Sequence, residues 1–127
     1  MNASMKLSIA ISNTSDIPIY RQLYDQIAAA VIKGDIAPNE CLPTIRSFAS
    51  ELGISVITVK RTWEELERSG LISTVQGKGC FVMSLSEEER NSIRRDMAVK
   101  HIKNNIAFYK SLGLSSAELI SIIKQEY

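Results

Sequence analysis

Cysteine and histidine are scarce in this sequence. It contains two cysteines, Cys41 and Cys80, and a single histidine, His101. No Cys-x-x-Cys pair is present and the three residues lie far apart, whereas zinc sites take their ligands from closely spaced pairs. We therefore expect no metal or other cofactor. In a reducing cytosol we expect both thiols to be buried and unreactive, with a redox switch as the alternative.

Signs of export or membrane insertion are also missing. The first fifteen residues hold one lysine and the short alternation Leu7–Ile11, interrupted by serine. This segment is too brief for a signal peptide or a membrane span. The sequence thus predicts a soluble, cytoplasmic protein with no membrane partner.

An excess of charge of one sign is absent, because 15 basic and 14 acidic residues leave a net charge of +1. A polyanionic partner would have to be bound by a local cluster of cations. Catalytic patterns are missing too: the histidine has no neighbouring nucleophile, and no paired carboxylates or phosphate-binding loop are evident. We therefore expect that the protein is not an enzyme.

Helical periodicity and turn signals are present throughout a chain of 127 residues that is 45% hydrophobic. They predict a helix after Pro18, a second over residues 44–52, and a third from the N-cap Ser55 to Gly70. The second and third helices, separated by the turn 53–55, form a helix-turn-helix. Their core-facing positions and those of the first helix are Tyr20, Leu23, Tyr24, Ile27, Ala30, Val31, Ile45, Phe48, Ala49, Leu52, Val59, Trp63 and Leu66.

Two β-prone runs follow the helix-turn-helix. Residues 71–75 and 80–83 are joined by the glycine-rich segment 76–79, which predicts a β-hairpin. A helix-turn-helix followed by a hairpin is the order of elements in a winged helix. The fold class predicted is therefore mainly α with one small hairpin, a winged helix-turn-helix.

The rest of the chain is predicted to be helical. Ser86–Glu89 has the pattern of a capping box that opens a long helix ending near Gly113, and Ser115–Glu118 opens another. We expect a winged helix-turn-helix DNA-binding domain over residues 1–83 and a helical, two-helix hairpin tail over residues 84–127.

The helix after Ser55 is polarised in a way that suits the major groove of DNA. Lys60 and Arg61 lie in its first half, whereas glutamates 64, 65 and 67 lie in its second half. The N-terminal end of the helix adds its own partial positive charge. Alternatively, the two cations belong to a solvated face and are balanced by the glutamates four residues on.

Two further cations are candidates for contacts with phosphates. Lys78 stands between Gly77 and Gly79, so the backbone at the tip of the hairpin can approach a phosphate or the minor groove. Arg46 lies in the first turn of the preceding helix, the part of a helix-turn-helix that usually touches phosphate. For each cation, an ordinary surface position is the alternative.

From Pro18 to Val82 the chain resembles the N-terminal DNA-binding domain of the GntR family of bacterial regulators. The resemblance is carried by PIYRQL, IKGDIAPNECLPTIRSFASELGIS, TVKRTWEELERSGLI and QGKGCFV, in the family's order and spacing. It implies DNA contacts at helix positions and at the wing, with Ile57 against a thymine methyl group. The complete set of expected DNA-binding residues is Thr44, Arg46, Ser55, Val56, Ile57, Thr58, Lys60, Arg61, Gly77, Lys78 and Gly79.

Two positions depart from the family's pattern. Val56 stands where many members carry an arginine in the recognition helix, and Asn39 stands where a loop glycine is usual. The first departure removes the guanine-reading contact that the resemblance would otherwise imply.

The tail resembles that of the YtrA subfamily, which lacks the larger ligand-binding domains of other members. The resemblance implies a homodimer that represses transcription from an inverted-repeat operator. The expected dimerisation residues are Ile93, Met97, Ile102, Ile106, Leu119, Ile122 and Ile123. Alternatives are a tail that folds back on its own wing domain, a winged helix used for protein contacts, and a small-molecule effector site at the tail interface.

Overall fold

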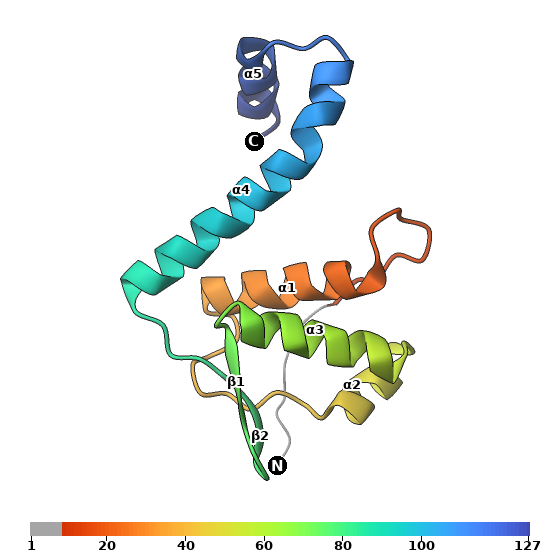
Figure 1. Ribbon diagram of the computed structural model, residues 1–127, viewed down its shortest axis with the longest axis vertical. Helices are drawn as coiled ribbons and strands as arrows, with labels where there is room; N and C mark the ends of the chain where they lie inside the picture. The colour runs from red at the N-terminus through yellow and green to blue at the C-terminus, as the bar shows by residue number, and fades with distance from the viewer. Residues whose placement is uncertain (1–8) are drawn as a thin grey trace. The chain divides into compact units, whose positions relative to one another are not determined.

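The computed structural model describes residues 9–127. The first eight residues, which include the start of the alternation Leu7–Ile11, lie outside the described residues. The described chain forms five helices and two strands in the order α1, α2, α3, β1, β2, α4, α5 (Figure 1). It divides into two compact units, one ending at Arg90 and a second, Asn91–Tyr127. The mainly helical winged helix-turn-helix predicted from the sequence is confirmed.

Helix α1 spans Ile19–Lys33 and is the scaffold of the first unit. Pro18 occupies the N-cap position, where its missing N–H costs nothing, and its carbonyl accepts hydrogen bonds from the amides of Arg21 and Gln22. Leu23 and Ile27 are fully buried at helical spacing, as predicted.

Helices α2 (Ile45–Leu52) and α3 (Val56–Arg68) form the helix-turn-helix. Between them Gly53 adopts the left-handed conformation that ends α2. Gly70 ends α3 as expected, in a Schellman motif in which the Leu71 amide donates to the Leu66 carbonyl at 3.0 Å. Local end signals therefore explain both helix boundaries.

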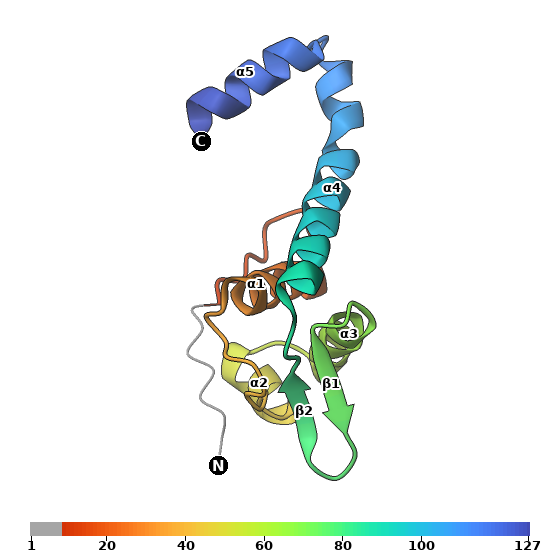
Figure 2. The same ribbon diagram turned by 90° about the vertical axis from the view of Figure 1, so that its left-hand side faces the viewer.

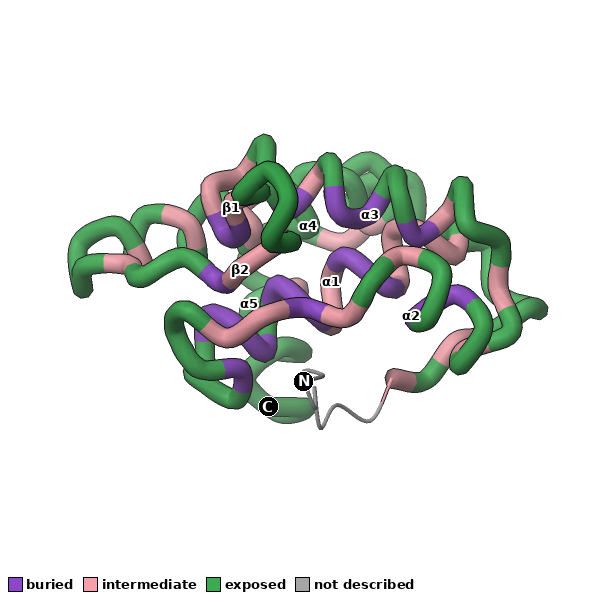
Figure 3. Tube along the Cα trace, turned by 90° about the horizontal axis from the view of Figure 1, so that it is seen from below, coloured by how far each residue is buried: buried purple, intermediate pink, exposed green. Residues whose placement is uncertain are grey.

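The core of the first unit lies where α1 and α2 pack on α3 (Figures 2 and 3). Val59, Trp63 and Leu66 form the predicted inward stripe of α3, and the rings of Phe48 and Trp63 meet with centroids 5.2 Å apart. Thr62 is the one fully buried polar residue among those that the structure describes. Its hydroxyl donates to the Thr58 carbonyl at 2.9 Å, which satisfies the hydroxyl without water.

Strands β1 (Ile72–Val75) and β2 (Gly79–Val82) pair antiparallel as the wing, with Ile72 opposite Val82 and Val75 opposite Gly79. The predicted turn over residues 76–79 is thus one residue too long, because Gly79 is the first residue of β2. The Lys78 amide donates to the Val75 carbonyl at 2.9 Å and closes the turn over residues 76–78.

A short extended segment, residues 40–42, pairs with the other edge of β2 and was not predicted. The Leu42 amide donates to the Cys80 carbonyl at 2.8 Å, and the Val82 amide donates to the Glu40 carbonyl at 2.9 Å. Cys41 lies in this segment and Cys80 lies in β2, and both are only partly buried; the prediction that both thiols are buried is wrong.

Asn39 explains why a glycine is usual at its position. It is the one non-glycine residue with a positive φ in the described chain, at 68°, and its amide donates to the Val82 carbonyl at 2.8 Å. Asparagine tolerates this left-handed conformation better than other side chains. We predict that Asn39→Ala lowers the free energy of unfolding by about 1 kcal/mol. Asn39→Gly should change it by less than about half of that, and urea denaturation compares the two.

Helix α4 (Glu87–Ser111) begins in the first unit, where Ser86 and Glu89 form the predicted capping box. The backbone N–H of Ser86, and then its side chain, stabilise the carboxylate and lower the pKa of Glu89. Next to it, the Arg90 guanidinium donates to the Ile32 carbonyl in the last turn of α1 at 2.9 Å. A cation at this end of a helix also interacts favourably with the helix dipole.

Helix α5 (Ser116–Glu126) begins at the second predicted capping box, between Ser115 and Glu118. The chain bends by 118° between α4 and α5, a more open arrangement than an antiparallel hairpin. Over the described residues, no single helix has the length and apolar composition needed to cross a membrane. Helices α4 and α5 would meet that criterion only if they were taken together across the bend.

Candidate nucleic-acid interface

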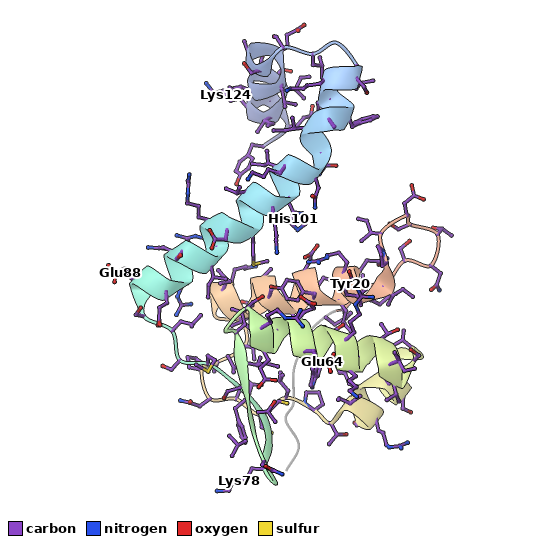
Figure 4. All side chains as sticks on the ribbon, in the orientation of Figure 1. Tyr20, Glu64, Lys78, Glu88, His101 and Lys124 are labelled. Atoms are coloured by element: carbon purple, nitrogen blue, oxygen red, sulfur yellow. The ribbon has the colours of Figure 1, made fainter. Side chains whose placement is uncertain are left out.

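The N-terminal half of α3 presents apolar and cationic side chains to solvent. Val59 and Trp63 hold the helix to the core, whereas Ile57 and Lys60 lie off this buried face and are exposed. Val56 shares the face of Trp63 but is 42% exposed, because it is the first residue of the helix. Ile57 is 78% exposed, which is unusual for a large apolar side chain and leaves it available to a partner. The outward face of α3 continues to Glu64 in its second half (Figure 4).

The first turn of α3 is capped by the side chain of its N-cap residue, Ser55. The Ser55 hydroxyl accepts from the Thr58 amide at 3.1 Å, and the hydroxyls of Ser55 and Thr58 lie 2.9 Å apart. The cap leaves the amides of Val56 and Ile57 at the end of the helix, where its partial positive charge is concentrated. This end of α3 therefore favours an anion.

The two cations in the first half of α3, Lys60 and Arg61, are not balanced by the glutamates that follow them. In the described part of the chain, neither Lys60 nor Arg61 forms an ion pair; Glu65 pairs with Arg68 instead. The guanidinium of Arg61 lies 3.7 Å from the centroid of the Tyr20 ring. A solvated helix face with balanced charges would form ion pairs between residues four apart, and among the described residues Lys60 and Arg61 form none.

Helix α2 contributes two neighbouring candidate DNA-binding residues, Thr44 and Arg46. Thr44 is its N-cap, with the hydroxyl oxygen accepting from the Ser47 amide at 3.1 Å, and Arg46 is exposed in its first turn. The Thr44 hydroxyl keeps its own proton free to donate. Both residues lie on the helix that packs directly against α3.

The wing carries the third group of candidate DNA-binding residues. Lys78 is exposed at the tip of the hairpin (Figure 4), and Gly77 before it has a φ of 80° that only glycine adopts readily. The structure thus gathers the predicted residues of α2 and α3 in one helix pair, whereas Gly77, Lys78 and Gly79 lie on a separate projection.

Tyr20 is the residue of this region that sequence reasoning misassigned. Its helical spacing placed it with the core, but it is only half-buried, and its ring supports Arg61. No local signal could have revealed this contact, because the two residues are far apart in sequence.

The second unit leaves most of its apolar side chains in solvent. No residue of α4 or α5 is buried, and all of both helices are described. Of the predicted dimerisation residues, Ile93, Met97 and Leu119 are half-buried, and Ile102, Ile106, Ile122 and Ile123 are exposed. Phe108, Leu112 and Ile120 are exposed as well, at 60%, 59% and 52%.

Comparison with known proteins identifies a family and several relatives that this chain resembles. Residues 19–82 match the family of bacterial regulatory proteins called the gntR family. The chain is 31% identical to the uncharacterized HTH-type transcriptional regulator YhcF of Bacillus subtilis, covering 87% of this chain and 90% of that protein. It is 28% identical to the HTH-type transcriptional repressor YtrA of the same organism, covering 92% of this chain and 90% of that protein.

One of the solved structures that this chain resembles is a complex with DNA. The DNA-binding domain of AraR, in complex with the operator ORX1, aligns with a TM-score of 0.53 and 28% identity. The alignment covers 60% of this chain and 95% of that one. The likeness to AraR therefore concerns the winged helix and not the tail.

Proposed function

The chain belongs to the GntR family of bacterial regulatory proteins and is a DNA-binding transcriptional regulator, and we propose that it is a cytoplasmic repressor acting as a homodimer. Its operator would contain two inverted half-sites, one for each α3. The observation that carries the proposal is the exposed N-terminal half of α3, with unbalanced cations on a helix fixed by a buried opposite face.

The proposed contacts divide by chemistry. Ile57 would pack on a thymine methyl group, and the helix end at Ser55 would approach a base edge or phosphate. Lys60 would contact a guanine or phosphate in the major groove, and Arg46 a phosphate of the flanking backbone. Lys78 at the wing tip would add one charge contact in or beside the minor groove.

The proposed dimer rests on the second unit. A unit of two helices with no buried residue exposes too much apolar surface to be stable in water alone. In a two-fold dimer, the apolar surface of one copy covers the same surface of the other. The alignments with YhcF and YtrA each cover 90% of the relative, so both relatives are long enough to contain such a tail. Two linked recognition helices also bind far more tightly than one.

Selection of bound duplexes from a random pool, with the full-length protein, tests the proposal. We expect enrichment of one sequence with two inverted half-sites, and affinity that falls steeply as salt rises, since phosphate contacts release counterions. Recovery of no preferred sequence, with weak binding at low salt, would refute operator binding and favour a winged helix used for protein contacts.

Substitution of the two proposed cations provides a direct prediction. Lys60→Ala and Arg46→Ala should each weaken operator binding by about tenfold or more, since a dimer loses two contacts at once. Each should also reduce the slope of log affinity against log salt by about 2. Fluorescence anisotropy with labelled operator measures both quantities.

Arg68→Ala is the matched control, because Arg68 is a cation on the same helix but lies at its far end and pairs with Glu65. It should leave affinity within about twofold of the wild type. Equal losses in all three variants would show that only overall charge matters and would remove the contact assignment.

A further inference from the structure

We propose that Tyr20 is a positioning residue, which holds the Arg61 guanidinium ready to bind a backbone phosphate beside the groove that α3 enters. This inference rests on the proposed function, because it concerns the same DNA surface. It adds a residue of α1 to a surface otherwise made by the helix-turn-helix and the wing.

The position of Tyr20 relative to α3 is fixed by buried contacts. Helices α1 and α3 lie side by side and run in the same direction (Figures 1 and 2). The fully buried Thr62 lies with its hydroxyl 3.4 Å from the Tyr20 carbonyl, and the hydroxyls of Tyr24 and Ser69 meet at 2.6 Å farther along. The Tyr20 ring is therefore held against the first half of α3, the half proposed to face DNA (Figure 4).

The contact between Arg61 and Tyr20 leaves the guanidinium able to bind an anion. The guanidinium carbon lies over the ring at 3.7 Å from its centroid, a close cation–π contact whose short distance fits the guanidinium plane lying on the ring. Stacking uses the face of the guanidinium, whereas its five N–H groups point outward in its plane and remain available to phosphate oxygens. The ring also restricts the rotamers of a long, exposed side chain, so less entropy is lost when a phosphate binds.

The charges around the ring distinguish Arg61 from its neighbour Arg21. The Arg21 guanidinium lies 5.5 Å from the same ring centroid, but it also pairs with Asp25 at 3.9 Å and is therefore balanced within α1. Arg61 has no such acidic partner among the described residues, because Glu65 is engaged by Arg68. Of the two guanidinium groups on the ring, Arg61 is the one whose charge is available to DNA.

The inference is tested with the full-length protein and the operator duplex recovered by selection. Arg61→Ala should weaken binding by about tenfold and reduce the salt slope by about 2 for the dimer. Tyr20→Leu should weaken binding about threefold with an unchanged slope, since the charge remains but its position is lost. Tyr20→Phe keeps the ring and should bind like the wild type.

A double variant separates positioning from a merely structural role. If Tyr20 acts through Arg61, Tyr20→Leu combined with Arg61→Ala should bind no more weakly than Arg61→Ala alone. Equal losses from Tyr20→Leu with and without Arg61 would overturn the inference, as would wild-type binding by Arg61→Ala. Thermal unfolding of every variant identifies any loss that comes from unfolding.

Arg61→Lys decides the matter if Tyr20→Leu fails to fold. Lysine keeps the charge but lacks the planar group that stacks on the ring, so affinity should fall with the salt slope retained. Wild-type affinity in Arg61→Lys would then overturn the role of Tyr20. Failure of the wild-type protein to bind any duplex is a different result, because it would refute the proposed function itself.

Discussion

Replacing Ile122 and Ile123 by glutamate is expected to make the protein monomeric and to weaken its binding to a two-half-site operator by about 10²-fold to 10⁴-fold. Both side chains are large and apolar, and both are exposed on α5, at 42% and 50%. In the proposed homodimer the two-fold axis would bring four new carboxylates into an apolar interface, where unpaired charges are costly. Loss of the dimer removes the high effective concentration of the second recognition helix.

Light scattering measures the oligomeric state, and anisotropy measures affinity for duplexes with one or two half-sites. The variant should bind a single half-site as the wild type does, because α3 and the wing are unchanged. Ser121→Glu is the control, since it adds one negative charge at the polar position directly before the two isoleucines and removes no apolar side chain. A wild-type protein that is monomeric at micromolar concentration, or a doubly substituted variant that remains a dimer, would contradict the proposed interface.

The helix-turn-helix was predictable from sequence because its signals are local. Ser55 is followed within one turn by the amide it caps, and Val59, Trp63 and Leu66 repeat at the period of a single helix. The helix closes at Gly70 through hydrogen bonds from the Gly70 and Leu71 amides to carbonyls three and five residues back, respectively. Each signal depends on neighbours within a few residues, so no knowledge of tertiary structure was needed.

The features that sequence did not reveal depend on contacts between distant segments. Residues 40–42 contain no run long enough to predict a strand, and they pair with β2 only because it offers a free edge about forty residues later. The support of Arg61 by Tyr20 likewise needs α1 and α3 to be packed together. For the candidate site, residue types could identify the cations but not their partners, which decide whether a cation is free for DNA.

The departure at Val56 leads to the second large effect that we expect. Val56 is the first residue of α3 and 42% exposed, at the end of the helix proposed to enter the major groove, where many members of the family carry arginine. Val56→Arg should create a preference for guanine at one position of each half-site, because arginine binds guanine O6 and N7 with two hydrogen bonds. Each such pair discriminates by about 1–3 kcal/mol, so in a dimer the preference should be at least about 30-fold.

Selection from a random pool with the wild type and with Val56→Arg shows whether this preference appears. Glu64→Gln is the control, because it makes the same change in net charge on the outward face of α3 but adds no guanine-reading group. It should raise affinity for all sequences alike, since a purely electrostatic gain acts through phosphates. If Val56→Arg raises affinity for all sequences as this control does and creates no preference for guanine, position 56 does not reach a base edge. The recognition helix must then read the groove through Ile57 and Lys60 alone.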